Sequence, residues 1–66
     1  MTTFRFVQTK RAQYLMRETD GQPPEIVMSR RAGGTMFSPS LVRAAKRLAS
    51  DIESEGGEAQ IVEVRR

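Results

Sequence analysis

Apolar and polar residues alternate along the first part of the chain with the period of a β-strand. In the stretch TFRFVQT, residues 3 to 9, Phe4 and Phe6 fall on one side and Arg5 and Val7 fall on the other. An alternation of this kind predicts a strand that buries one of its faces. We expect the two phenylalanines to belong to the core.

A second strand is predicted over residues 12 to 18, AQYLMRE. The alternation puts Tyr14 and Met16 on one face and Leu15 and Arg17 on the other. We expect the tyrosine to lie in the core. Leu15 and Arg17 are then expected on the face that points away from the two phenylalanines of the first strand.

Turn-forming residues separate this strand from a third one. The run DGQPP, residues 20 to 24, ends the second strand because proline cannot donate to a ladder and Asp-Gly favours a turn. Residues 25 to 30, EIVMSR, predict a third strand with Ile26 and Met28 on one face. A second break is expected at AGG, residues 32 to 34, followed by a short extended piece.

The clearest pattern is that of a helix over residues 39 to 55. Ser38 is a typical N-cap residue and Pro39 suits the first helical position. The pair Gly56-Gly57 supplies a C-terminal stop. Apolar residues recur at helical spacing and predict one buried stripe, which is formed by Leu41, Ala45, Leu48 and Ile52 and widened by Val42 and Ala49.

A last strand is predicted over residues 58 to 65, EAQIVEVR. The element order is therefore β-β-β-α-β. The simplest way to bury the apolar faces is a single α+β domain, residues 1 to 66, in which one helix packs on one face of a mostly antiparallel sheet of three or four strands. A right-handed crossover through the helix would place the last strand parallel to a neighbour.

Composition limits what such a domain can use for stability. Sixty-six residues bury only about 60% of the surface of the unfolded chain, and the sequence has no cysteine and no histidine. Disulfides, thiolate sites and histidine metal sites are therefore excluded, and no metal or cofactor is expected. A symmetric homodimer is one way to complete so small a core.

The same absences argue against an enzyme. No serine or threonine has a histidine to activate it, and the acids Asp51, Glu53 and Glu55 lie in a solvated run near the helix end. The glycine pair after residue 32 lacks the spacing of a dinucleotide or phosphate loop. We expect no catalytic residues.

Charge is distributed unevenly along the chain. Residues 1 to 50 carry nine basic and three acidic side chains, whereas residues 51 to 66 carry two basic and five acidic ones. Nine of the eleven basic residues are arginine, the better fork for phosphate or carboxylate. A GC-rich genome would produce the same preference with no function behind it.

The helix carries its charges against its own dipole. Its basic residues lie in the first half and its acids in the second, whereas the dipole favours the reverse. Ordinary drift on a solvated face is one explanation. The functional explanation is an anion-binding surface at the loop of residues 30 to 37 and the start of the helix, formed by Arg30, Arg31, Ser38, Ser40, Arg43, Lys46 and Arg47.

We therefore expect a small non-enzymatic binding or regulatory protein whose partner is nucleic acid or a nucleoprotein. The alternative is a protein-interaction module, such as a phage-type inhibitor, that acts through its sheet face or a free edge. On that face arginines are expected beside aliphatic residues, a mixture common in protein interfaces, and the candidates are Arg5, Val7, Leu15 and Arg17.

No apolar run approaches the roughly 18 residues that span a bilayer, and no signal peptide opens the sequence. We expect a cytoplasmic protein with no membrane partner.

Overall fold

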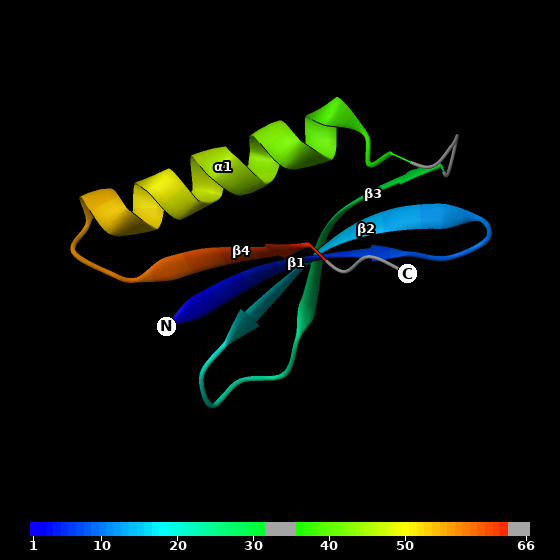
Figure 1. Cartoon of the computed structure of the whole chain (residues 1–66). Coiled ribbons are helices and arrows are strands. Elements are labelled where there is room, and N and C mark those ends of the chain that lie inside the picture. The colour runs from blue at the N-terminus through cyan, green and yellow to red at the C-terminus, as the bar shows by residue number, and fades with distance from the viewer. Residues whose placement is uncertain (32–35, 64–66) are drawn as a thin grey trace.

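The computed structural model describes residues 1–31 and 36–63. Four strands and one helix follow one another within these residues (Figure 1): β1 (Thr2–Gln8), β2 (Ala12–Thr19), β3 (Glu25–Arg31), α1 (Pro39–Ser54) and β4 (Ala59–Glu63). The predicted α+β class and element order are confirmed. The expected break at residues 32 to 34 lies outside the described residues, and Met36 and Phe37, part of the expected extended piece, are not in a strand.

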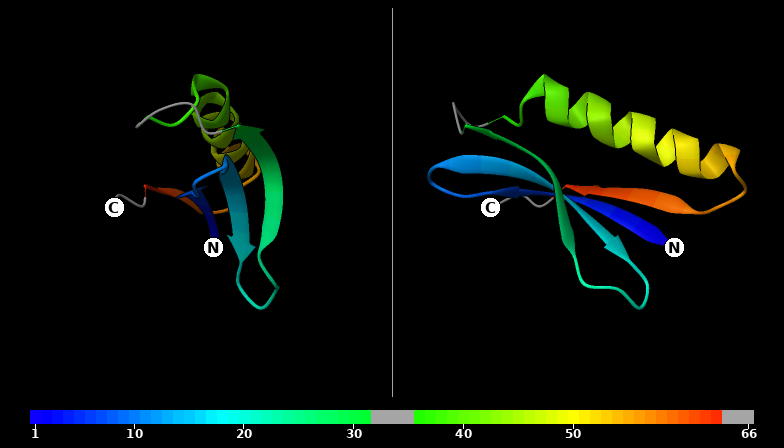
Figure 2. Two further views of the ribbon diagram at one scale, coloured as in Figure 1. Left: turned by 90° about the vertical axis from the view of Figure 1, so that its right-hand side faces the viewer. Right: turned by 180° about the vertical axis from the view of Figure 1, so that it is seen from behind.

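The four strands form one mixed sheet in the order β3-β2-β1-β4. β1 pairs antiparallel with β2, β2 pairs antiparallel with β3, and β4 pairs parallel with β1. The helix connects the two edge strands and lies on one face of the sheet (Figures 1 and 2). The parallel neighbour expected for the last strand is confirmed, whereas the strand order had not been predicted.

The core lies between α1 and the face of the sheet that it covers, which we call the inner face. Phe4, Phe6 and Leu15 from the sheet are at most 2% exposed. The helix contributes Leu41, Ala45 and Ala49, and the two alanines let its backbone approach the strands closely. Phe37, just before the helix, stacks on Phe6 with the ring centroids 5.2 Å apart. The opposite side of the sheet is the outer face.

The face assignment of β2 was wrong. Leu15 lies opposite Phe6 in the β1–β2 register and is fully buried on the inner face. Tyr14 lies opposite Val7 and Met16 opposite Arg5, so both apolar residues belong to the outer face. Alternation within one strand shows which residues share a face, but only the pairing with β1 decides which face meets the helix.

The expectation that Ile26 and Met28 share a face was also wrong. Leu15 pairs with Met28 and Met16 pairs with Ile26, so Val27 is an extra residue without a partner in β2. This β-bulge reverses the alternation within β3. Met28 and Val27 both pack against the core, and Ile26 lies on the outer face with 60% of its surface exposed.

Arg17 lies on the inner face, not on the outer face as expected. It is opposite Phe4 in the register and forms an ion pair with Glu25 across β2 and β3. In Figure 1 the turn between these two strands extends away from α1. The helix therefore leaves this end of the inner face open to solvent, where a charged pair is tolerated.

Both ends of the predicted helix are confirmed to within a residue. Pro39 occupies the first position after the N-cap Ser38. At the other end the Gly56 N–H donates to the Glu53 carbonyl and the Gly57 N–H donates to the Ile52 carbonyl, a Schellman motif in which Gly56 has a φ of 87°. The buried stripe differs slightly from the prediction, because Ala49 is buried whereas Leu48 and Ile52 are only partly buried.

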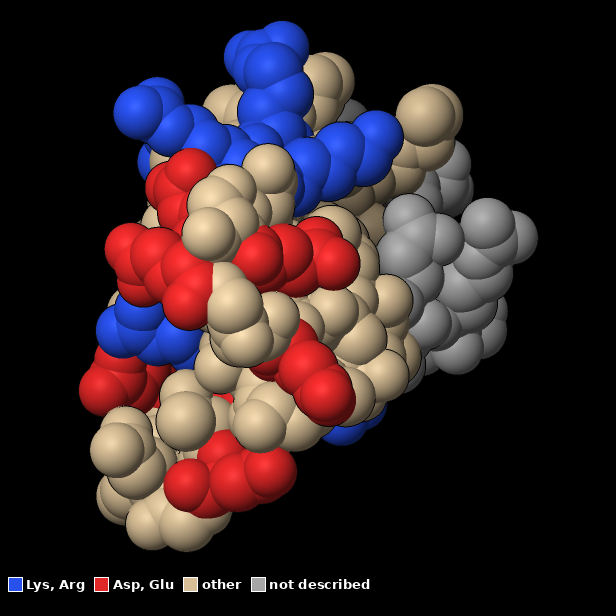
Figure 3. Space-filling model, turned by 90° about the vertical axis from the view of Figure 1, so that its left-hand side faces the viewer, with Lys and Arg blue, Asp and Glu red and all other residues tan. Residues whose placement is uncertain are grey.

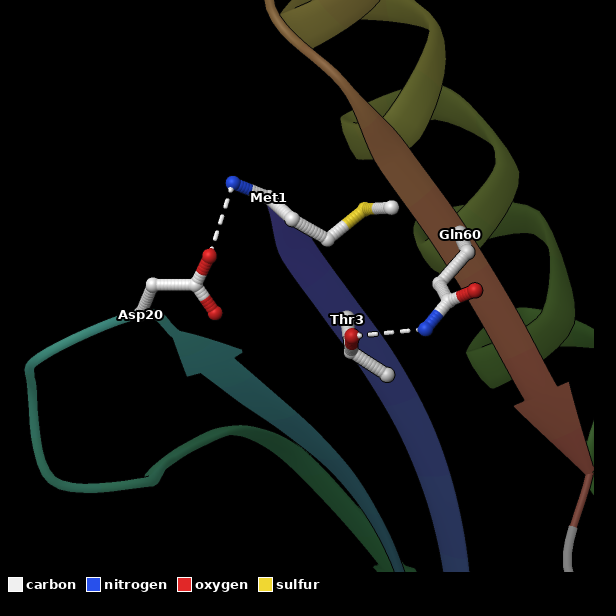
Figure 4. Close-up of polar contacts among 4 residues, drawn as sticks. All are labelled: Met1, Thr3, Asp20 and Gln60. Atoms are coloured by element: carbon white, nitrogen blue, oxygen red, sulfur yellow. Dashed lines mark hydrogen bonds and ion pairs between the residues drawn. The ribbon is translucent and has the colours of Figure 1, made fainter.

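The first residues of the chain are fixed at two points, shown in Figure 4. The amino group of Met1 lies 3.3 Å from a carboxylate oxygen of Asp20, after β2. The Gln60 side chain on β4 donates to the Thr3 hydroxyl on β1 at 3.1 Å, on the face away from α1. No helix in the described residues has the length and apolarity that crossing a bilayer requires.

Candidate anion-binding site

The start of α1 is held by its backbone rather than by a side-chain cap. The N–H groups of Leu41 and Val42 donate to the Ser38 carbonyl at 3.0 and 3.2 Å. The Ser38 hydroxyl makes no capping bond and instead lies 2.9 Å from the Ser40 hydroxyl. Pro39 has no N–H, and the N–H groups of Leu41 and Val42 are already used. Of the backbone donors in the first turn, the N–H of Ser40 is therefore the one left for an anion.

A buried glutamine on β2 fixes the chain that leads into the helix. Gln13 is 1% exposed, and its Oε1 accepts from the Ser38 N–H at 2.8 Å. Its Nε2 donates to the Met36 carbonyl, also at 2.8 Å. This residue was not predicted from the sequence, although its position two residues before Leu15 gives it the same face. Gln13 therefore sets where α1 begins relative to the sheet.

Arg30 lies at the helix start, as predicted. It is opposite Gln13 in the β2–β3 register, which places it on the inner face. Its Nε donates to the Ser40 hydroxyl at 3.1 Å and its Nη1 donates to the Ser29 carbonyl at 2.8 Å. A guanidinium has five N–H donors, so the remaining ones are available to an anion. Arg30, Ser38 and Ser40 thus form one connected polar cluster.

Arg31 does not join that cluster. It is still within β3, opposite Ala12, rather than in a loop as expected. Consecutive strand residues point to opposite faces, so Arg31 belongs to the outer face. The expectation that Arg30 and Arg31 serve one surface was wrong because the strand continues one residue further than predicted.

The three basic residues of the helix are exposed on its solvent side. Arg43, Lys46 and Arg47 line an open depression together with Ala44. Within residues 1–31 and 36–62 none of the three forms an ion pair. The pairing of Arg47 with Asp51 that their spacing permits is also not formed there.

Charges on the helix are separated along its length. Its first turn contains no acid and its last turn no base. Figure 3, which faces the C-terminal end of α1, shows most of the visible Lys and Arg along the upper edge, Asp and Glu over the surface below it, and a smaller basic patch among these acids. A partner that approaches the start of the helix therefore meets positive charge, and one that approaches its end meets negative charge.

Helical spacing aligns most of the predicted anion-binding residues of α1. Ser40, Arg43 and Arg47 stand at i, i+3 and i+7, which places them along one side of α1. Arg30 extends this row through its bond to Ser40. Lys46 lies on the adjoining side of the helix. We call these residues the basic row: Arg30, Ser38, Ser40, Arg43, Lys46 and Arg47.

The second predicted surface is not one surface. Arg5 and Val7 lie on the outer face, whereas Leu15 is buried and Arg17 lies on the inner face. Arg5 is also paired with Glu18 at 3.2 Å. A partner on the outer face would therefore contact only the first two of these four residues.

No protein-family model matches the sequence, and comparisons with curated proteins and with solved structures also find no match. Among the described residues, no three acidic, histidine or cysteine side chains come together in a group that could hold a metal ion.

Proposed function

We propose that this protein is a non-enzymatic binding protein that engages the phosphate backbone of nucleic acid, free or within a nucleoprotein, through the basic row. The observation that carries the proposal is the exposure of Arg43, Lys46 and Arg47 without ion pairs among the described residues. Phosphate contacts from such residues position a protein on nucleic acid without reading its sequence.

The arrangement of these cations is unfavourable for the isolated protein. Arg43, the one nearest the start of the helix, opposes the dipole at a cost of at most a few tenths of a kcal/mol. Arg43 and Arg47, four residues apart on one side, repel each other by a similar amount. This repulsion destabilises a domain whose core is already small. A negatively charged partner bound to the exposed cations would relieve it.

Arg30 strengthens the proposal because it is positioned before any ligand arrives. Its bonds to Ser40 and Ser29 restrict the side chain, and its other N–H donors make no bond to the part of the chain that the structure describes. Restricting a long side chain in advance reduces the entropy cost of binding, about 0.5–1.5 kcal/mol for each side chain of this kind.

The test is a salt titration of binding to labelled DNA and RNA of mixed sequence, followed by fluorescence anisotropy. The double variant Arg43→Gln/Arg47→Gln should weaken binding and reduce the slope of log K against log salt by about 2, roughly 1 for each phosphate that is no longer neutralised. The control of equal net charge is Arg5→Gln/Arg17→Gln, which alters two arginines of the sheet that are paired with Glu18 and Glu25 and lie outside the basic row. It should retain the slope.

Equal losses of affinity in the two double variants would show that net charge alone drives the binding and would contradict the proposal. A wild-type protein that binds neither nucleic acid at low salt would point to the alternative function, a protein-interaction module. That function would use the sheet rather than the helix.

A further inference from the structure

The outer face of the sheet carries an apolar band that no part of the described chain covers. A single row of cross-strand neighbours runs over all four strands, from Val62 through Arg5 and Met16 to Ile26. Val7 and Tyr14 form the next pair along the strands. These apolar side chains are half-buried by their neighbours, except for Ile26, which is 60% exposed.

The amount of exposed surface is larger than a monomer of this size normally has. A folded monomer of 7.4 kDa is expected to expose about 4,200 Å². This chain exposes 4965 Å², and its radius of gyration is 11.8 Å where about 11 Å is usual for its length. The excess, roughly 750 Å², belongs to the whole chain and accompanies its elongated form of 36 × 22 × 18 Å, so the first core is thin for a domain of this length.

The charges on this face fit a second copy of the same chain. Arg5 and Glu18 neutralise each other within one molecule, so two outer faces do not repel at the centre. Arg31, the further cation of this face, lies at the end of the edge strand β3, five residues beyond Ile26 and away from the central row. Arg43, Lys46 and Arg47 lie on α1, which covers the opposite face of the sheet, away from such a contact.

We propose that two copies associate symmetrically through their outer faces. Two sheets pack about 10 Å apart with their apolar side chains between them, and the helices then form the two outside layers. The dimer gains a second core next to the thin first one. Both basic rows remain exposed on opposite sides of the assembly.

The test compares two exposed isoleucines on opposite faces. Ile26 lies on the outer face, and Ile61, which is 40% exposed, lies opposite the buried Phe4 and so belongs to the inner face. Sedimentation equilibrium of the wild type from low to high micromolar concentration should show a monomer–dimer equilibrium. Ile26→Glu should weaken the dimer at least about 100-fold, because an unpaired carboxylate would be buried. Ile61→Glu should leave it unchanged.

Folding of each variant is checked by circular dichroism, and Ile26 is exposed enough in one copy to accept a carboxylate without unfolding. A second measurement is independent of any variant: the melting temperature of the wild type should rise with protein concentration. A wild type that is monomeric throughout, or a dimer that Ile26→Glu does not weaken, would overturn the proposal. So would a dimer that Ile61→Glu dissociates.

Discussion

The two faces of this sheet have similar apolar content but opposite surroundings. On the inner face Phe6 and Leu15 lie beneath α1 and are at most 2% exposed. On the outer face Val7 and Tyr14, in the same two strands and the neighbouring register positions, have no layer of the described chain above them. Composition does not explain the difference, because both faces offer aliphatic and aromatic residues.

The connection through α1 and the register of the strands explain the difference between the two faces. The helix follows an edge strand and returns to the opposite edge, so it can cover only one face. The β1–β2 register then aligns Leu15 with Phe6 and Tyr14 with Val7. An apolar residue in such a domain is therefore core or surface according to its cross-strand partner.

The largest expected effect is on stability, and it should differ between two neighbouring residues of β2 that lie on opposite faces of the sheet. Leu15→Ala should lower the free energy of unfolding by about 2–5 kcal/mol, since it leaves a cavity beneath the helix. Met16→Ala should lower it by less than about 1 kcal/mol in dilute, monomeric protein. Denaturant unfolding followed by circular dichroism measures both.

If Leu15→Ala does not fold, Leu15→Met provides the control, because it conserves volume and should cost less than about 1.5 kcal/mol. Equal decreases in stability for Leu15→Ala and Met16→Ala would contradict the assignment of the two faces.

A smaller effect is expected from the buried amide of the inner face. Gln13→Leu leaves the Ser38 N–H and the Met36 carbonyl without partners, at a cost of about 1–3 kcal/mol. Gln60→Leu, which removes an exposed bond on the outer face, should change stability by no more than about 0.5 kcal/mol. Faster hydrogen exchange at the Ser38 amide in Gln13→Leu would confirm the mechanism, and unchanged exchange would refute it.

The two arginine–glutamate ion pairs should behave alike although they lie on opposite faces. Arg5–Glu18 and Arg17–Glu25 are each more than a third exposed. Double-mutant cycles should give coupling energies of about 0.2–1 kcal/mol for both, and added salt should reduce them. A coupling energy well above this range at Arg17–Glu25 would show that α1 covers that end of the inner face after all.

The smallest effect concerns the solvent side of α1, which belongs to neither face. Arg43→Glu should raise the free energy of unfolding by a few tenths of a kcal/mol, because an acid replaces a base near the positive end of the dipole. The same substitution should weaken binding to nucleic acid. Thermal unfolding at low salt measures the first change, and a decrease in stability would mean that Arg43 has a structural role.

Sequence patterns located the elements well where local chemistry defines them. Ser38, Pro39 and the pair Gly56-Gly57 limit the helix through backbone requirements that need no tertiary information. The alternation of β1 likewise identified Phe4 and Phe6 as core residues, because its other face carries an arginine.

What depends on pairing between distant residues could not be predicted in this way. The face of Tyr14, the bulge at Val27 and the separation of Arg30 from Arg31 all follow from register. Gln13 was missed for a related reason: a glutamine is buried only if two specific backbone groups meet it, and both belong to a segment more than twenty residues away.

The parallel pairing of β1 with β4 affects how the chain acquires its structure during synthesis. It joins residues 2–6 to residues 59–63, so β1 completes its ladder only when β4 has left the ribosome. Until then one side of β1 presents unpaired backbone groups, and the hairpin of β1 and β2 is too small to be stable alone. Because this contact joins strands far apart in the sequence, we expect the four-stranded sheet to be completed only after β4 has emerged from the ribosome.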